Sequence, residues 1–397
     1  MIKKITVLLL VVSLVAVAFM SCSQQPTTES SAPAASSQVS EAASAQRPEG
    51  GWKIGYTSNY LGNSWRTQYQ QAVESRFKQY EEKGIVRDFT FVSCNSDVTE
   101  QLNQLNTMLQ EDYDIIMVDA VSAASLTSVI DEANKKGIKI MLGNTICAYE
   151  GIPSVTADLR AYADIEASWL SEKLNHSGNI LEIYGVSGQG TCALFEKYAH
   201  QVFDQYDIKT LAKGNGMWSD AESQKVAATM LSTYGDQVDG IFCEDGMTMG
   251  IVNAFLNADE QTVPVGGDYF KTFIDYWNKH PELKSIIIPN SPFATGTAMV
   301  DVMVYMLDGY EFQADKYAPN PLDESIQNWI PLTMPCVVVS DEDKDAAYLK
   351  KYPDMKILSV ADAAKTVEGK EETAAMEIYY DNDYIASLFG LDKSLYW

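Results

Sequence analysis

The sequence is poor in histidine and in basic residues. Its three histidines form no HExxH pair, and no EF-hand loop occurs, which excludes the common signatures of zinc proteases and calcium sensors. Lysine and arginine together number 29 against 54 acidic residues, for a net charge of −25. A surface this acidic repels nucleic acids and anionic lipid headgroups. We therefore expect no nucleic-acid partner and no bound metal.

Cysteine is scarce as well, with six residues, no CxxC motif and no Cys/His ligand spacing, so a zinc-binding framework is not expected. Five cysteines follow the first 50 residues, and an odd number leaves at least one thiol free. We expect most of them to be small buried hydrophobic residues. The one disulfide considered joins Cys147 to Cys192. The five are Cys94, Cys147, Cys192, Cys243 and Cys336.

The first 51 residues have the layout of an export signal followed by a tether. Two lysines precede an apolar run over residues 5–20, as in a secretory leader, and this run is too short for a membrane span of about 20 residues. A small residue then precedes Cys22, which resembles a bacterial lipobox and predicts a signal peptide over 1–21 and a lipid on Cys22. Cleavage after Ala18 is the alternative. Residues 22–51 are too polar to fold and predict a disordered tether, so the expected location is extracytoplasmic, lipid-anchored to the cell membrane.

From residue 52 onward, short β-branched runs alternate with amphipathic segments, which is typical of βαβ units around a parallel sheet. A second series begins after Asp158, so we predict an α/β chain with two doubly wound parallel-sheet lobes. The predicted limits are 52–157 for the N-terminal lobe, 158–290 for the C-terminal lobe, 291–335 for a return to the N-terminal lobe, and 336–397 for a segment that crosses back and ends in a tail. Predicted strands are 53–56, 89–93, 114–119, 138–142, 179–184, 208–211, 240–243, 263–266, 285–288 and 337–340.

Aromatic, carboxylate and carboxamide side chains follow the predicted strands of both lobes. Open α/β sheets bind ligands at the carboxyl ends of their strands. These side chains suit an uncharged sugar, because aromatic rings stack on its C–H face while carboxylates and amides bind its hydroxyl groups. Trp65 and Trp218, one from each lobe, are placed to sandwich a ring. The candidate site residues are Asn63, Trp65, Arg66, Asp119, Asn144, Gln189, Phe195, Trp218, Asp245, Asp268 and Asn290.

Each candidate also has a purely structural interpretation. A single Trp after a strand more often packs inside a lobe than stacks on a ligand, and Ser219 and Asp220 are better explained as helix caps. Asp119 and Asp245 end apolar strands, where an unpartnered carboxylate is costly. Each therefore needs a partner, which is either a ligand or a protein N–H group. The prediction of a binding site depends on the recurrence of such residues at equivalent places in two lobes.

Five short segments carry a family resemblance: Ile54–Asn59, Gly62–Trp65, Gly137–Ile140, Asp239–Met247 and Val265–Asp268. Their succession resembles the ribose-binding-protein-type periplasmic sugar-binding family over about residues 52–340. The resemblance implies two lobes joined by a three-stranded hinge, a sugar held between them, and delivery to the permease of an ABC importer. We expect a monomer. Carried over by position, the implied ligand residues are Asn63, Trp65, Asp119, Trp218, Asp245, Asp268 and Asn290.

The sequence departs from this family at two arginines. Phe195 stands where the family usually has a sugar-binding Arg, and Gly143-Asn144 match its Asp-Arg pair at the end of the fourth strand. Arg66 or Gln189 is placed to compensate. The bound solute is therefore expected to differ from that of a ribose site.

Enzymatic alternatives have less support. Residues 188–193 fit GxGxxA, a dinucleotide-binding fingerprint, but no acidic residue ends the next strand. Residues 185–189 miss the nucleophile elbow by their last residue, and the carboxylates are spread over two lobes rather than paired as in a glycosidase. We therefore expect a solute-binding lipoprotein with no enzymatic activity and no cofactor. A sensor domain that presents a sugar to a membrane receptor is the remaining alternative.

Overall fold

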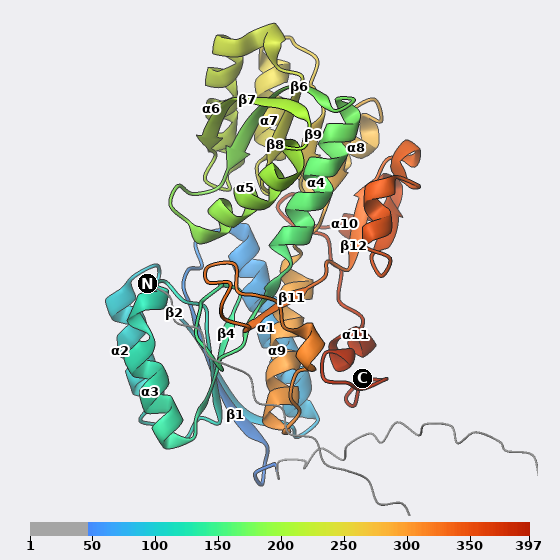
Figure 1. The fold of residues 1–397 in the computed structure, drawn as a ribbon. Coiled ribbons are helices and arrows are strands. Elements are labelled where there is room, and N and C mark those ends of the chain that lie inside the picture. The colour runs from blue at the N-terminus through green and yellow to red at the C-terminus, as the bar shows by residue number, and fades with distance from the viewer. Residues whose placement is uncertain (1–46) are drawn as a thin grey trace, which may run out of the picture. The chain divides into compact units, whose positions relative to one another are not determined.

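The computed structural model describes residues 47–397, which contain two sheets (Figure 1). The predicted signal peptide, Cys22 and most of the predicted tether lie outside the described residues. Among the helices of residues 47–397, none has both the length and the apolar character needed to cross a membrane.

The first sheet has six strands in the order β11-β5-β4-β3-β1-β2, and all neighbouring pairs are parallel. We call this sheet and the helices packed with it the first lobe. Its strands are β1 (Trp52–Ser58), β2 (Val86–Ser93), β3 (Ile115–Val118), β4 (Lys139–Gly143), β5 (Ser154–Ala157) and β11 (Trp329–Leu332). Its helices are α1 (Ser64–Glu82), α2 (Val98–Met108), α3 (Thr127–Lys136), α9 (Pro292–Leu307) and α11 (Asn382–Ser387).

The second sheet has seven strands in the order β13-β12-β10-β9-β8-β6-β7. With its helices it forms the second lobe. Its strands are β6 (Ser177–Tyr184), β7 (Asp207–Asn215), β8 (Gly240–Cys243), β9 (Val265–Gly267), β10 (Ser285–Ile287), β12 (Cys336–Val339) and β13 (Lys356–Ser359). Its helices are α4 (Leu159–Lys173), α5 (Gly190–Phe203), α6 (Asp220–Tyr234), α7 (Thr248–Asn257), α8 (Lys271–Lys279) and α10 (Val360–Val367).

Both sheets share the doubly wound strand order, as β2-β1-β3-β4-β5 and as β7-β6-β8-β9-β10, which confirms the predicted fold class. Up to β12 the chain passes between the lobes three times, between β5 and α4, between β10 and α9, and between β11 and β12. The second sheet is not purely parallel, because β12 runs antiparallel to β10. The short connection from β11 brings the chain into the second sheet at the end where β10 leaves it, so β12 must run in the opposite direction.

Three strands, β5, β11 and β13, are absent from the sequence prediction, and β11 and β13 lie at the edges of their sheets. Each has only four residues, and β5 and β13 include polar ones, so neither a periodic pattern nor an unbroken apolar run marks these two. Pro331 lies within β11 and argues against a strand from sequence alone. These segments are strands because they pair with neighbouring strands of the sheet, and that pairing cannot be read from their own sequences.

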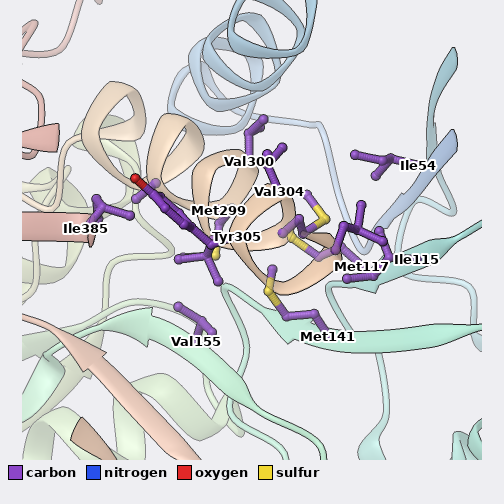
Figure 2. Packing of buried hydrophobic residues seen from close by; sticks show 14 of the residues in the cluster. Ile54, Ile115, Met117, Met141, Val155, Met299, Val300, Val304, Tyr305 and Ile385 are labelled. Carbon is purple, nitrogen blue, oxygen red and sulfur yellow. The ribbon is translucent and has the colours of Figure 1, made fainter. Parts of the chain in front are cut away.

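Helix α9 forms the centre of the core on one face of the first sheet (Figure 2). It follows β10 of the second lobe, begins with Ser291 as N-cap and Pro292 in its first turn, and is buried along nearly its whole length. Such a helix must be covered on most sides. Its apolar side chains lie against the sheet on one side and against α11 on another. The residues that meet there include Ile54, Ile115, Met117, Met141, Val155, Met299, Val300, Val304, Tyr305 and Ile385.

The segment after α10 connects the lobes a fourth time. In the second lobe, Lys271 N donates to Ala374 O at 2.8 Å and Met376 N donates to Tyr269 O at 2.9 Å. In the first lobe, the Gln68 side chain donates to Thr373 O at 3.0 Å and accepts from Ala375 N at 2.9 Å. The chain then reaches α11, which packs on α9 (Figure 1). The acidic, tyrosine-rich tail, which has no sequence periodicity, is therefore part of the folded core.

Candidate ligand-binding site

The strand order places two pairs of loops where doubly wound sheets bind ligands. In each sheet the order reverses at its first strand, so the binding position lies beyond the carboxyl ends of β1 and β3 in the first lobe and of β6 and β8 in the second. Asn59 and Asp119 directly follow β1 and β3. Gly185 follows β6, and Glu244 and Asp245 follow β8.

Asp119 is fully buried, and only one of its two carboxylate oxygens is bonded within the described chain. The Arg66 guanidinium, from the first turn of α1, forms an ion pair with Oδ2, and Asn144 Nδ2 donates to the same oxygen at 3.3 Å. Oδ1 is buried without a hydrogen-bond partner in the described chain. Burial raises the pKa of Asp119, and Arg66, Asn144 and the nearby Thr145 hydroxyl oppose that rise. We call Arg66, Asp119 and Asn144 the Asp119 cluster, and it offers one buried acceptor.

Trp65 connects the Asp119 cluster to the second lobe. Its ring stacks on Tyr69, with centroids 5.1 Å apart and an interplanar angle of 14°, and Arg66 lies 5.3 Å from its ring centre. Its Nε1 donates to the carbonyl of Asn290 at 2.8 Å, in the segment that follows β10. Burial and Asp245 raise the pKa of Tyr269, and the Trp65 side chain beside it acts in the opposite direction. One side chain of the first lobe therefore contacts two parts of the second.

Asp245 and two tyrosines form a second polar group. The Tyr269 hydroxyl, just after β9, donates to Asp245 Oδ2, and no protein group described here bonds to Oδ1. Burial raises the pKa of Asp245 to about 6. Tyr162, in the first turn of α4, lies close enough for the charge of Asp245 to affect its pKa. We call Tyr162, Asp245 and Tyr269 the Asp245 cluster. The sequence prediction contains only Asp245 of these three.

Glu244 holds the loop after β6 in place and lies beside Trp218. Its Oε2 accepts from Gly185 N at 2.6 Å and from the Cys192 thiol at 3.0 Å, and the neighbouring Trp218 side chain lowers the pKa that burial raises. The Trp218 indole lies on Gly185, where a Cβ would be only 2.0 Å from Cε2. Glycine at this position is therefore needed for the observed place of the indole. Glu244 is the positioning residue that the sequence prediction missed, although it directly precedes a predicted candidate.

The buried Glu244 carboxyl makes stability depend on pH. Burial raises its pKa from the usual 4.5 to about 7, so between these values the folded chain binds the proton more tightly than the unfolded chain. Stability is then highest at low pH within this range and falls as pH rises through it, by up to a few kcal/mol from this group. We expect Glu244→Gln to reduce the drop in Tm between pH 5 and pH 8. Thermal unfolding at both values measures it.

The control for this change is Glu260→Gln, because Glu260 is exposed. Asp245 and Asp268 contribute pH dependence of the same sign, since burial raises their pKa values to about 6 and about 8. The Glu244→Gln protein should therefore retain part of the slope. A pH slope identical to that of the parent chain would contradict the assigned role of burial at Glu244.

Several other candidates make local contacts. Asn63 is the N-cap of α1, and its Oδ1 accepts from Arg66 N at 2.9 Å. Asp268 is buried, and its Oδ1 accepts from Phe270 N at 2.9 Å. The side-chain oxygen of Asn290 accepts from the Thr295 hydroxyl at 3.2 Å. Ser219 caps α6, as expected. A ligand contact by Asn63, Asp268 or Asn290 stays a prediction, since part of each side chain is already bonded within the protein.

Two candidates, Phe195 and Gln189, belong to neither polar cluster. Phe195 is 1% exposed, and its ring packs on Phe242 at 4.9 Å and edge-on to Tyr162 at 4.8 Å. The structure thus places Phe195 in the core of the second lobe, because an apolar ring at this position packs with other rings. Gln189 is exposed, precedes α5 and makes no capping bond. Of the two residues expected to compensate for the missing arginines, only Arg66 joins a cluster.

The cysteines are all free and buried from Cys94 onward, so the Cys147–Cys192 disulfide considered from the sequence is wrong. Cys192 instead donates to Glu244 in the second lobe. One group within residues 47–397 has metal-ligating proximity, Glu182, Glu196 and His200. Lys213 Nζ lies 2.6 Å from Glu196 and 3.1 Å from His200 Nε2. The Lys213 ammonium therefore already balances the negative charge of Glu182 and Glu196, as a metal ion would.

The chain is similar to known proteins in both sequence and structure. A family model described as "Periplasmic binding protein domain" matches residues 54–311. The xylitol-binding protein of Mycolicibacterium smegmatis is 30% identical over 178 residues, which are 44% of this chain and 51% of that protein. The D-apiose import binding protein of Paraburkholderia graminis is 21% identical over 241 residues, 60% of this chain and 77% of that protein. The matched region thus spans only about half of the first relative's length.

Solved structures share the fold. An ABC transporter solute binding protein from Thermobispora bispora has a TM-score of 0.61 at 21% identity, covering 81% of this chain and 98% of the other. A periplasmic solute binding protein from Actinobacillus succinogenes with bound D-allose has a TM-score of 0.59 at 19% identity, covering 74% and 99%. At these identities the likeness concerns the fold.

Proposed function

Because this chain belongs to the periplasmic binding protein family, we propose that it is an extracytoplasmic solute-binding protein of an ABC importer. In this proposal it captures a small uncharged carbohydrate or polyol between its two lobes and delivers it to the permease. Xylitol and D-apiose appear in the names of two relatives, and D-allose is bound in a related structure. All three are uncharged and carry several hydroxyl groups.

The observation that carries this proposal is the free oxygen of Asp119. Oδ1 is buried without a partner at the end of β3, in the position where doubly wound sheets bind ligands. A buried acceptor left unpaired costs about 1–3 kcal/mol, which a ligand hydroxyl would recover. The charge of Arg66 is already neutralised by Asp119. The cluster therefore suits a hydrogen-bond donor without charge and offers no free cation to a sugar acid or a sugar phosphate.

The aromatic residues supply the apolar part of the proposed site. Trp65 in the first lobe and Trp218 in the second are both partly exposed. Trp65 lies beside Arg66 of the Asp119 cluster, and Trp218 lies on Gly185 beside Glu244. We propose that these two tryptophans contact the C–H faces of the solute. The Trp218 indole lies on Gly185, whose backbone N–H is bonded to Glu244, and a ring held in place reduces the ordering cost of binding.

A panel of solutes tests the function. Xylitol, D-xylose, D-apiose, D-allose, myo-inositol and, as negative controls, sugar acids are titrated while tryptophan fluorescence is followed. We expect at least one uncharged solute to change the fluorescence, and Trp218→Ala to weaken its binding about tenfold or more, because ring stacking contributes of order 1 kcal/mol and apolar burial adds to it. Calorimetry measures the affinities. Trp397→Ala, at an exposed indole of the first lobe, is the control and should bind normally. No response to any uncharged solute would count against the function.

Closure of the lobes is the proposed mechanism. In this proposal the hinge is formed by the three crossings up to β12, which lie between β5 and α4, between β10 and α9, and between β11 and β12. A solute that contacts both lobes stabilises the closed arrangement and shifts the population toward it. The permease can then recognise closure as the sign of an occupied site.

Attachment to the membrane through Cys22 completes the proposal. A lipid on Cys22 and a flexible stretch over 22–51 would keep the protein at high effective concentration beside its permease. Two or more acyl chains are needed for stable anchoring. Labelled palmitate that is incorporated into the parent chain but not into Cys22→Ala would support this arrangement, and equal labelling of both would contradict it.

A further inference from the structure

Tyr162 carries a buried hydroxyl that nothing in the protein uses. The side chain is 3% exposed, and its hydroxyl oxygen has no hydrogen-bond partner in residues 47–397. The same holds for four other buried side-chain atoms in this range. These are Asn59 Oδ1, Asp119 Oδ1, Glu166 Oε2 and the hydroxyl of Tyr348. Two of them, Asn59 and Asp119, directly follow β1 and β3 in the proposed site.

The ring of Tyr162 is held in one orientation. Phe195 packs against it edge-on, with ring centres 4.8 Å apart and an interplanar angle of 83°. Phe195 is fixed in turn by Phe242 of β8. Phe195 stands where the resembling family usually has a sugar-binding Arg. In this chain its ring packs against Tyr162 and supports it.

The surroundings of the hydroxyl are acidic, because Asp245 and Glu166 lie near it. Glu166 lies one helical turn further along α4, on the same face, and its Oε1 accepts from Cys243 N at 3.1 Å at the end of β8. Burial, Asp245 and Glu166 raise the pKa of Tyr162 well above its usual value, and Tyr269 and Cys243 act in the same direction. The hydroxyl therefore keeps its proton and can donate it in a hydrogen bond.

Asp245 supplies the complementary group. Its Oδ2 accepts from Tyr269, whereas Oδ1 has no bond from the part of the chain described here. A ligand hydroxyl near both residues could accept from Tyr162 and donate to Asp245. This pairing would satisfy one donor and one acceptor with a single uncharged group.

We propose that Tyr162 is a ligand-contacting residue of the second lobe, which donates a hydrogen bond to an oxygen of the bound polyhydroxyl solute. The inference rests on the proposed function and adds α4 to the elements that contact the solute. Phe195 then acts as a positioning residue through the Tyr162 ring. A solute that lacks the corresponding hydroxyl group would be rejected, because the buried Tyr162 donor would remain unpaired.

The test compares Tyr162→Phe with Tyr348→Phe in the full chain. Tyr348, in the 3₁₀ segment Ala347–Lys351, is also 3% exposed, belongs to the same core cluster of the second lobe and has an unpartnered hydroxyl. Both changes remove one oxygen. We expect both variants to melt at the same temperature as the parent or higher, because no protein bond is lost. We expect Tyr162→Phe alone to weaken binding of the panel solute that the parent binds, by about tenfold to a hundredfold.

Two results would overturn the inference. One is unchanged affinity of Tyr162→Phe for that solute. The other is a lower melting temperature of the solute-free Tyr162→Phe protein than of Tyr348→Phe, which would show that the hydroxyl has a structural partner, such as Glu166 or a permanently bound water. If the parent binds no solute of the panel, the proposed function fails, and the melting temperatures alone decide whether the Tyr162 hydroxyl is unpartnered.

Discussion

Replacement of Asp119 by Asn should weaken solute binding about a hundredfold or more. The carboxylate holds Arg66 and Asn144 with one oxygen and leaves the other free. Asn keeps the shape of the side chain but removes the charge that Arg66 pairs with, and hydrogen bonds to charged groups contribute about 1.5–3 kcal/mol each. The released Arg66 would also place an unpaired charge beside the solute. Calorimetry with the solute identified by the panel measures the loss.

The matched control for this change is Asp301→Asn. Asp301 is another buried carboxylate of the first lobe, but its oxygens accept from Arg76 at 2.8 and 2.7 Å and from Tyr80 at 2.7 Å. Removing one partner of such a buried pair costs about 3–5 kcal/mol, so both variants should lose stability in denaturant unfolding. Only Asp119→Asn should lose affinity. Equal affinities of the two variants would mean that Asp119 is solely structural.

Deletion of residues 380–397 should unfold the first lobe. Phe389 stacks on Tyr305 at 5.0 Å and on Phe312 at 4.6 Å. Full burial of a large apolar side chain contributes about 1.5–3 kcal/mol, and a whole domain is stable by only about 5–15 kcal/mol. The deleted segment contributes several such side chains to the core of the first lobe. They are Tyr380, Ile385, Leu388 and Phe389.

Circular dichroism and limited proteolysis measure the effect of the deletion. The control is Tyr379→Ala, because Tyr379 directly precedes the deleted segment and is 48% exposed. We expect this variant to melt cooperatively, as the parent does. A truncated chain that keeps the parent's Tm would show that the tail is dispensable. The family match ends at residue 311, so the contribution of the tail follows from this structure and not from the family.

Sequence periodicity predicted the sheets well. The predicted strand 240–243 has the same limits as β8, and 114–119 exceeds β3 by one residue at each end. Such short buried apolar runs between helices are local signals that one segment carries by itself. The short strands β5 and β11 were missed because their own sequences do not mark them as strands and only their pairing with neighbouring strands does.

For the candidate site, the sequence predicted which residues follow the strands but not which atoms are free. Asp119 and Asp245 were expected to need partners, and the structure supplies them as Arg66 and Tyr269 rather than as backbone N–H groups. Phe195 was expected in the site, and the structure places its ring in the core of the second lobe against Tyr162. No sequence signal marks Tyr162, because it lies in a helix turn and not after a strand.

The sequence by itself determined the α/β class, the division into two doubly wound series and the chemical character of the strand ends, because each of these is expressed within a short segment. Only the tertiary structure decided that Arg66 meets Asp119, that Phe195 supports Tyr162, and that the tail closes the core around α9. These contacts join residues far apart in the chain, so they exist only once the elements have packed. That packing decides which buried polar atoms have a hydrogen-bond partner and which do not. The atoms without a partner identify the proposed site.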